Sequence, residues 1–382
     1  MPPLGLDIFS LNQMKQETRL TDRLKGNPPI SIPVDLSLVE RQLKAKPFRP
    51  HPLLRNNHAQ TILAYLYPRR AQLNSELKND EERLFEVAPG VRLLAHCRWQ
   101  TREKRRKTPT LILVHGLEGS SNSIYMLGTA AAAFANGFNV LRLNLRSCGS
   151  TEHLTNTLYH SGMSEDLRRI IEELIEKDCL EQIFLAGFSL GGNMSLKLAG
   201  EWNENPPPEL RGVAAVSPPI DLAACSDAIG FRSNWIYNRR FLNNLAKRMR
   251  RVQKLYPERF QTEGIEQIRS IRDFDSRFTA PYGGFKDVDD YYSRSSSLKL
   301  IEKIRVPTLI VHAQDDPFVP FTAFNQISRG ANPFVILLAP ENGGHVGFVA
   351  DSKTDGKNRF WAENRIIQFC RLLSESHNVL GR

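Results

Sequence analysis

Residues 187–191 read Gly-Phe-Ser-Leu-Gly and place a serine between two glycines in a G-x-S-x-G pattern. An apolar run at residues 183–186 precedes the pattern, and residues 193–202, which can form a helix, follow it. In this context the pattern predicts a sharp strand-to-helix turn that exposes the hydroxyl of Ser189. The two flanking glycines are needed because side chains there would collide as the helix packs back on the strand. The turn also places the serine at a helix N-terminus, where partial positive charge favours a developing oxyanion.

A serine hydroxyl is a weak nucleophile near neutral pH, so it needs a general base, and the base needs an orienting carboxylate. In the chain order typical of this turn, the acid follows the serine and the histidine follows the acid. His345 lies in a glycine-rich loop directly after the apolar run at residues 334–338. Such a loop lets an imidazole reach over the sheet edge, and we therefore predict that His345 is the base for Ser189.

Two adjacent acids, Asp315 and Asp316, follow the apolar run at residues 307–313. The turn after a buried strand is where the orienting carboxylate is expected. Counting from the end of the run slightly favours Asp316, whereas counting back from Pro320 favours Asp315. We expect the acid that does not orient the base to bind backbone N–H groups of the turn.

An oxyanion that forms during nucleophilic attack needs backbone N–H donors aimed at it. Leu190, the residue after the nucleophile, is predicted to supply one donor, and a loop after an earlier strand should supply the other. Residues 110–114 predict that strand, and the small residues of the following His-Gly-Leu-Glu-Gly-Ser segment at residues 115–120 allow a close backbone approach. We predict the second donor at Leu117.

Apolar runs alternate with helix-forming stretches along most of the chain. Residues 83–99 alternate in polarity around an Ala-Pro-Gly turn and predict a β-hairpin. Further strands are predicted at residues 111–114, 139–145, 183–186, 212–217, 307–313 and 334–338, with helices at residues 123–136, 164–177 and 193–202 between the earlier ones. Nearly continuous apolar strands that alternate with helices predict an α/β fold with a mainly parallel, doubly wound sheet covered on both faces.

The alternation of predicted strands and helices, and its interruptions, divide the chain into four segments. Residues 1–45 are polar and rich in proline, and we expect a loosely packed N-terminal extension. Residues 46–221 and 301–382 are predicted to form the two parts of the α/β core. Residues 222–300 interrupt the rhythm and predict a helical cap inserted over the active site.

The longest helix of the insertion is expected within residues 231–256. Its apolar side chains recur three or four residues apart and predict one stripe, formed by Phe241, Leu245, Met249, Val252 and Tyr256. Its basic side chains are expected largely off that stripe, namely Arg240, Lys247, Arg248, Arg250, Arg251 and Lys254. A cap helix packed on the core is the simpler interpretation, and a basic amphipathic surface that docks on a membrane is the alternative.

With these segments the chain resembles the α/β-hydrolase superfamily and, more closely, its YheT-like branch of ABHD-type lipid esterases. The closer match is carried by motifs at residues 56–63, 115–120, 159–162, 187–193, 312–317 and 343–348, and it covers roughly residues 50–373. The resemblance implies hydrolysis of carboxylic esters, often lipid or short acyl esters, with neither a metal nor an organic cofactor. The substrate varies across the branch, so the resemblance does not name it.

The amino-acid composition limits the classes of protein to which the chain can belong. The chain has 382 residues, of which 41% are hydrophobic, as in a soluble globular protein. Its five cysteines are scattered without a C-x-x-C pair, which indicates neither a zinc site nor a disulfide framework. No apolar run approaches the ~20 residues of a membrane span, and the first residues lack the features of a signal peptide. We therefore expect a cytoplasmic protein.

The net charge of +10 at pH 7 raises the question of an anionic partner. No basic module interleaved with aromatic residues accompanies the excess, so we expect no nucleic-acid binding. Clusters such as residues 102–107 are expected to be solvated surface charge, and peripheral contact with an anionic membrane surface is the alternative.

These observations predict a serine hydrolase that cleaves carboxylic esters through an acyl-enzyme. Ser189 would attack, His345 would accept its proton, and Asp316 or Asp315 would orient the imidazole. An acyltransferase that uses an alcohol as acceptor is one alternative, and a non-catalytic protein that binds a lipid or a partner is another. The acyl length, the alcohol group and the oligomeric state are not encoded in a form that can be read from the sequence.

Overall fold

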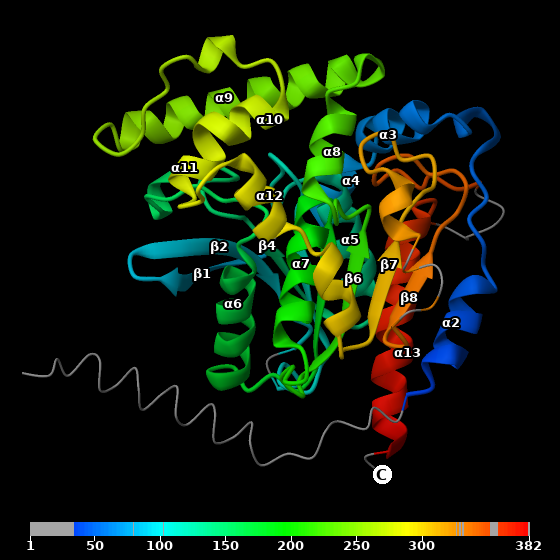
Figure 1. The fold of residues 1–382 in the computed structure, drawn as a ribbon. Coiled ribbons are helices and arrows are strands. Elements are labelled where there is room, and N and C mark those ends of the chain that lie inside the picture. The colour runs from blue at the N-terminus through cyan, green and yellow to red at the C-terminus, as the bar shows by residue number, and fades with distance from the viewer. Residues whose placement is uncertain are drawn as a thin grey trace, which may run out of the picture.

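The chain, described here from a computed structural model, folds around one eight-stranded sheet with the order β1-β2-β4-β3-β5-β6-β7-β8 (Figure 1). The structure describes residues 34–380 apart from positions 79, 102, 326, 328, 329, 331 and 352–357. The pairs β1–β2 and β2–β4 are antiparallel, and all other neighbours are parallel. The strands are β1 (Glu81–Ala88), β2 (Val91–Arg98), β3 (Thr110–Val114), β4 (Asn139–Leu143), β5 (Ile183–Phe188), β6 (Leu210–Val216), β7 (Thr308–Val311) and β8 (Val335–Leu338). The predicted α/β fold, with its hairpin and its mainly parallel sheet, is confirmed.

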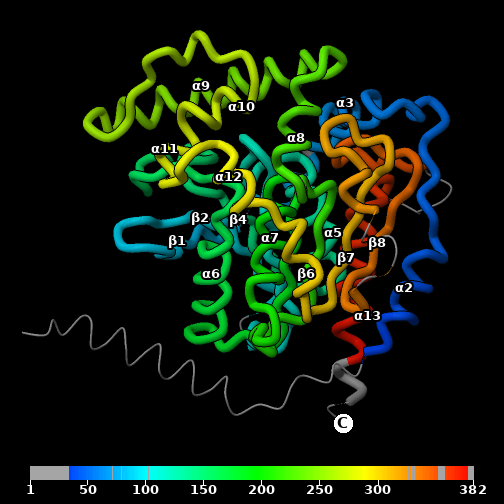
Figure 2. The backbone as a smooth tube through the Cα atoms, in the orientation of Figure 1, coloured from blue at the N-terminus to red at the C-terminus, as the bar shows by residue number. Residues whose placement is uncertain are grey.

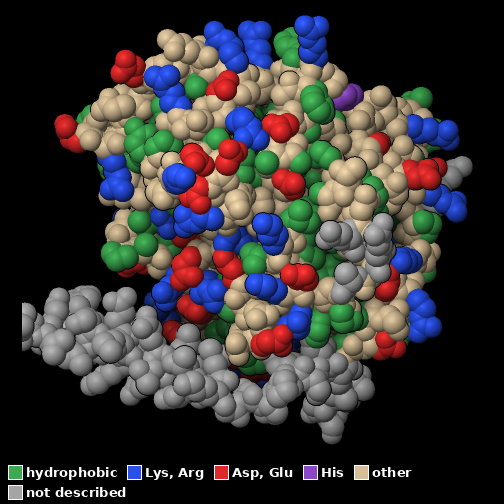
Figure 3. Space-filling view, in the orientation of Figure 1, with side chains coloured by type: hydrophobic (Ala, Val, Ile, Leu, Met, Phe, Trp, Pro, Cys, Tyr) green, Lys and Arg blue, Asp and Glu red, His purple; other side chains and the backbone are tan. Residues whose placement is uncertain are grey.

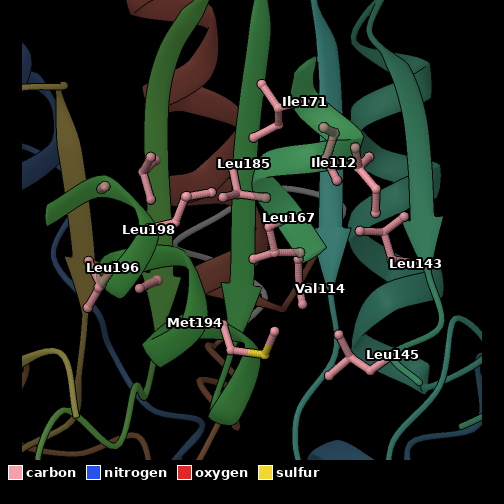
Figure 4. Packing of buried hydrophobic residues seen from close by; sticks show 14 of the residues in the cluster. Ile112, Val114, Leu143, Leu145, Leu167, Ile171, Leu185, Met194, Leu196 and Leu198 are labelled. Carbon is pink, nitrogen blue, oxygen red and sulfur yellow. The ribbon is translucent and has the colours of Figure 1, made fainter. Parts of the chain in front are cut away.

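Helices cover both faces of the sheet. On one face lie α5 (Ile124–Ala135) and α13 (Trp361–Leu380), and on the other lie α6 (Ser164–Glu176) and α7 (Leu190–Trp202). Successive side chains of β3 therefore enter two different clusters of buried residues. Ile112 and Val114 pack with Leu167 and Met194 on the α6–α7 face (Figure 4). Burial on both faces explains why the strands read as unbroken apolar runs.

The insertion at residues 222–300 lies beyond the carboxyl ends of the parallel strands (Figure 1). Its helices are α8 (Leu222–Ile229), α9 (Trp235–Leu255), α10 (Ile271–Phe274), α11 (Ala280–Tyr282) and α12 (Val288–Ser295). Leu245, Met249 and Val252 of α9 are buried in a separate apolar cluster with Phe260 and Phe274. The apolar stripe of this helix thus packs on the protein and is not available to a membrane.

One basic residue of α9 departs from the prediction. Arg248 is only 3% exposed, although we expected it on the solvated face of the helix. It lies next to the buried Met249 and points into the protein, where it pairs with Glu118 of the core. Helical periodicity could not predict this burial, because it depends on Glu118, a partner that is distant in the sequence.

The chain before the sheet is also more closely packed than expected. Asp35 caps α2 (Leu36–Lys44), whose Val39 and Leu43 are buried, and α2 lies beside α13 (Figure 2). Residues 35–45 are therefore packed rather than loose, while residues 1–33 lie outside the described residues. Two further helices follow, α3 (Asn57–Leu66) and α4 (Arg70–Glu76). Within the described residues, no helix has both the length and the apolar character needed to cross a membrane.

Candidate active site

Ser189 stands at the junction of β5 and α7. Its backbone has a φ of 51° and a ψ of −122°, a conformation that residues with side chains rarely adopt. A Cβ on Gly187 would strike the backbone of Gly191, and a Cβ on Gly191 would strike the carbonyl of Val114. The two glycines are thus required by close backbone approach, as the motif predicts, and the turn presents the serine at the start of α7.

His345 reaches Ser189 from the loop after β8. Its Nε2 lies 2.9 Å from the Oγ of Ser189, and its Nδ1 lies 2.8 Å from the Oδ2 of Asp316. An ionised carboxylate can only accept hydrogen bonds, so Nδ1 carries the ring proton and Nε2 is left to accept from the serine hydroxyl. This tautomer is the one that a general base for Ser189 needs.

The two adjacent acids have different partners. The Oδ1 of Asp316 accepts hydrogen bonds from the N–H groups of Phe318 and Val319, which leaves Oδ2 for His345. Asp315 instead accepts from the N–H of Gly344 at 2.9 Å, within the loop that carries the histidine. The structure therefore joins Asp316 to His345, and Asp315 binds backbone of the histidine loop.

The pKa shifts of the two acids also differ, and they favour the same assignment as the hydrogen bonds. Burial by itself raises the pKa of Asp316, but His345, His312 and the N–H of Phe318 outweigh it and hold that pKa below its ordinary value. Burial raises the pKa of Asp315, because its hydrogen bonds do not compensate fully. Asp316 is thus the acid that stays ionised and keeps the histidine in its tautomer.

Helix α3 supports both loops, a role that the sequence did not reveal. The Oγ1 of Thr61 accepts from the N–H of His345 at 2.9 Å, and the side-chain amide of Asn57 donates to the carbonyl of Asp315 at 2.8 Å. The buried Gln60 bonds both the N–H and the carbonyl of Val349. In the sequence, the motif at residues 56–63 served only as part of a family resemblance, because amide and hydroxyl side chains do not by themselves indicate a supporting role in an active site.

The N–H groups of the predicted pair, Leu117 and Leu190, have no protein acceptor within the described residues. Leu190 is the first residue of α7, and Leu117 and Leu190 line the same cavity as Ser189. A Cβ on Gly116 would lie 3.0 Å from the Cβ of Ser189, so the loop after β3 touches the elbow. The arrangement leaves both donors free for a substrate oxygen.

Other motif residues shape the site without facing the serine. Burial lowers the pKa of His115 to about 4, so its ring is neutral. Its Nδ1 donates to the carbonyl of Gly116, and its Nε2 accepts from the N–H of Leu145. The amide of Asn193 bonds Ser161 and so joins α7 to the motif at residues 159–162. Among the described residues, no group of three or more His, Cys, Asp or Glu side chains is placed to hold a metal ion.

Two cavities meet at Ser189 and His345. An inner cavity of about 90 Å³ runs beneath the cap, and an outer cavity of about 410 Å³ runs between α3 and α9. Both are lined by Leu117, Phe241 and Phe318 in addition to the serine and the histidine. A bound ester can therefore extend to both sides of the nucleophile.

The inner cavity has a polar wall. Asp275 accepts hydrogen bonds from the hydroxyls of Thr279 and Tyr292, at 2.6 Å and 2.9 Å. Burial raises the pKa of Asp275 to about 6, although both hydroxyls and two arginines lower it. All three of these polar side chains line the cavity, so it is not purely apolar.

Asp275 makes stability depend on pH. Because its pKa is about 6 in the folded state against 3.8 in the reference state, the folded protein binds more protons between these values. The destabilising contribution is absent below about pH 3.8 and complete above about pH 6. We expect Asp275→Asn to gain stability relative to wild type by up to ~3 kcal/mol between pH 4 and pH 7, measured by chemical unfolding at both values. A stability difference that does not change with pH would contradict the assignment.

Comparison with known proteins identifies relatives. A family profile described as the alpha/beta hydrolase fold matches residues 109–351. YheT of Escherichia coli (strain K12) is 31% identical over 315 residues, which cover 81% of this chain and 89% of YheT. A monoacylglycerol lipase of Saccharomyces cerevisiae is 29% identical over 285 residues, 72% of this chain and 61% of the lipase. The phospholipase ABHD3 of Mus musculus is 28% identical over 242 residues, 63% of this chain and 58% of ABHD3.

A solved structure agrees with the sequence relatives. The esterase Pf2001 of Pyrococcus furiosus superposes with a TM-score of 0.51 at 17% identity, over 78% of this chain and 94% of the esterase. At that identity the likeness shows the shared fold alone. The chain belongs to the α/β-hydrolase family, in its YheT-like branch.

Proposed function

We propose that the protein hydrolyses carboxylic esters through an acyl-enzyme. The observation that carries the proposal is the unbroken hydrogen-bonded chain from Ser189 through His345 to Asp316. Beside it, the N–H groups of Leu117 and Leu190 have no acceptor in the part of the chain that the structure describes. Its relatives include proteins named as a monoacylglycerol lipase and a phospholipase, which favours lipid or acyl esters as substrates.

In the proposed reaction the Oγ of Ser189 bonds to the acyl carbon as its proton passes to Nε2 of His345. The carbonyl oxygen becomes an oxyanion that accepts from the N–H groups of Leu117 and Leu190. The bond to the alcohol oxygen then breaks, and His345 gives its proton to the leaving alcohol. A water molecule repeats the sequence: His345 takes its proton, its oxygen attacks the acyl carbon, and the acid leaves as Ser189 regains a proton.

We assign the acyl group to the inner cavity and the alcohol to the outer one. The alcohol must depart first, and the outer cavity is bordered by exposed side chains such as Ile62, Tyr65 and Ile236. The side chains around the inner cavity are mostly buried. The inner cavity, of about 90 Å³, is also much smaller than the outer one, of about 410 Å³, which favours the shorter part of the ester. A medium-length acyl chain is therefore the preferred substrate.

A series of p-nitrophenyl esters combined with a fluorophosphonate probe tests the function. We expect covalent labelling by the probe, which reacts with an activated serine, and kcat/KM that peaks at medium acyl length and falls at least ~10-fold for a sixteen-carbon chain. Absence of labelling and of turnover would support a binding protein without catalysis. Transfer of the acyl group to added ethanol in preference to water would support an acyltransferase instead.

The mouth of the outer cavity suggests how a lipid ester arrives. Ile62, Tyr65 and Leu66 of α3 and Ile236 of α9 are exposed and line the outer cavity. Further exposed apolar side chains lie on or just before the same two helices, namely Leu53, Leu63, Phe231 and Trp235. Exposed arginines stand among them, Arg55, Arg70, Arg232, Arg239 and Arg240. Neither helix contains an acidic residue, and Figure 3 shows Lys and Arg side chains along the upper edge over α9. Apolar groups among unopposed cations favour an anionic lipid surface.

We expect the double variant Phe231→Ser, Trp235→Ser to bind anionic vesicles at least ~10-fold more weakly than wild type, because both side chains are exposed and neither lines a cavity. Vesicle co-sedimentation measures binding, and turnover of a soluble short-chain ester should stay unchanged. Leu255→Ser, an exposed leucine at the other end of α9, is the matched control and should bind like wild type. Equal loss in both variants, or equal binding to zwitterionic vesicles, would contradict an anionic docking face at the cavity mouth.

A further inference from the structure

Arg248 connects the cap to the loop that carries the predicted oxyanion donor. Its Nε lies 2.8 Å from the Oε1 of Glu118, and the side chains are only 3% and 7% exposed. The guanidinium also lies over the ring of Tyr159, 4.7 Å from its centroid. Glu118 directly follows Leu117, whose N–H is the predicted oxyanion donor. The guanidinium of Arg248 on α9 therefore binds the residue next to that donor.

The loop at residues 115–119 is fixed on both sides of Leu117. On one side the N–H of Gly116 donates to the hydroxyl of Tyr125 at 3.0 Å. On the other side the N–H of Glu118 donates to the hydroxyl of Tyr159 at 2.9 Å, and that hydroxyl donates back to the carboxylate at 2.9 Å. Glu118 also has a positive φ of 53°, a conformation that its surroundings must maintain. The direction of the free N–H of Leu117 therefore depends on where Glu118 is held.

The ion pair decides where Glu118 is held. Burial by itself lowers the pKa of Arg248, but the carboxylate of Glu118, together with Tyr159 and Cys148, outweighs burial and raises that pKa above its ordinary value. Without the guanidinium, the carboxylate would be a buried charge with one hydroxyl donor, which is strongly unfavourable. Turning outward to water would relieve the carboxylate, but it would also rotate the peptide groups on either side of Glu118.

We infer that Arg248 is a positioning residue that holds the oxyanion loop through Glu118 and so makes the oxyanion hole depend on the docked cap. The inference builds on the proposed ester hydrolysis and adds the cap to its machinery. Hydrolysis is then fast only when α9 lies in the observed position, because a displaced cap withdraws the guanidinium from Glu118. The cap helix in this way contributes to the chemical step as well as to the walls of the cavities.

The test compares Arg248→Met with Arg251→Met. Arg251 lies three residues further along α9 and also pairs with a core carboxylate, Glu152, but it does not touch the oxyanion loop. We expect Arg248→Met to lower kcat on a short soluble ester by ~10²-fold with KM changed less than ~3-fold, as for the loss of one oxyanion donor. A trifluoromethyl ketone, whose adduct carries the oxyanion, should lose affinity in proportion to kcat/KM. Arg251→Met should stay within ~3-fold of wild type in all three quantities.

Glu118→Gln covers the case in which Arg248→Met does not fold, because the amide preserves shape and can still accept from both donors. We expect it to lower kcat by ~10-fold with KM unchanged. The double variant should be no slower than Arg248→Met alone, because the two residues act through one contact. Wild-type kcat in a folded Arg248→Met variant, or losses that multiply in the double variant, would overturn the inference.

Amide hydrogen exchange keeps this inference separable from the proposed function. Exchange at Glu118, whose N–H donates to the hydroxyl of Tyr159, is expected to accelerate at least ~10-fold in Arg248→Met and to stay unchanged in Arg251→Met, whether or not an ester is hydrolysed. Unchanged exchange would refute the positioning role even with an active enzyme. Accelerated exchange in a protein that shows no turnover dependent on Ser189 would refute the proposed hydrolysis and leave the structural contact established.

Discussion

Replacing Ser189 with alanine is expected to lower kcat for p-nitrophenyl esters by ~10³-fold or more and to abolish labelling by a fluorophosphonate. The Oγ of Ser189 is the atom that His345 contacts at 2.9 Å, and alanine removes this proposed nucleophile without altering the backbone. The expected size follows from the way a serine, its base and its acid act as one unit. Steady-state turnover, together with a thermal unfolding scan to show an unchanged fold, makes the measurement.

Ser195→Ala is the matched control for this substitution. Ser195 lies on α7, the helix that begins directly after Ser189, is fully buried, and donates its hydroxyl hydrogen to the carbonyl of Gly191. This substitution also removes a serine hydroxyl but leaves the contact between Ser189 and His345 in place, so turnover of the variant should remain within a few-fold of wild type. A folded Ser189→Ala variant with wild-type activity would rule out the proposed nucleophile.

The second large effect is expected for Asp316→Asn, and it tests which of the two adjacent acids orients His345. Asp316→Asn is expected to lower kcat by ~10⁴-fold, because the variant favours the wrong imidazole tautomer. The N–H groups of Phe318 and Val319 both donate to one carboxylate oxygen, so asparagine must place its oxygen there. Its NH₂ group then faces Nδ1 of His345 and forces that nitrogen to accept, which moves the ring proton to the nitrogen that should receive the serine proton.

Asp315→Asn is the control for the choice of acid. Its oxygen can still accept from the N–H of Gly344, so we expect less than ~10-fold loss of kcat. The two variants differ from wild type by the same atoms at neighbouring positions, and the measurement is kcat on one ester. A greater loss for Asp315→Asn than for Asp316→Asn would show that the acid has been assigned to the wrong residue.

The sequence predicted most of the sheet because its signals are local. The buried strands read as apolar runs, and the Gly-x-Ser-x-Gly turn needs its glycines for contacts only a few residues away, between Gly187 and Gly191. Periodicity likewise predicted the buried side of α9 at Leu245, Met249 and Val252. These features depend on neighbours along the chain, so residue type and spacing are enough to find them.

What the sequence did not reveal depends on distant partners. Asp315 and Asp316 are chemically identical, and the contacts that show which of them meets the histidine, to Gly344 and His345, lie 29 residues further on. In the sequence Arg248 cannot be told from the other basic residues of α9, because the partner that buries it, Glu118, lies 130 residues earlier. Helix α2 was missed for a similar reason, because its burial comes from α13 at the other end of the chain.

The support that α3 gives to His345 bears on how the protein is made. Thr61 leaves the ribosome early, but the loop it holds follows 284 residues later. Contacts of such sequence separation form late, since much of the chain must be ordered before they can close. A nascent polypeptide therefore carries Ser189 through the synthesis of the next 156 residues before His345, its proposed base, is present.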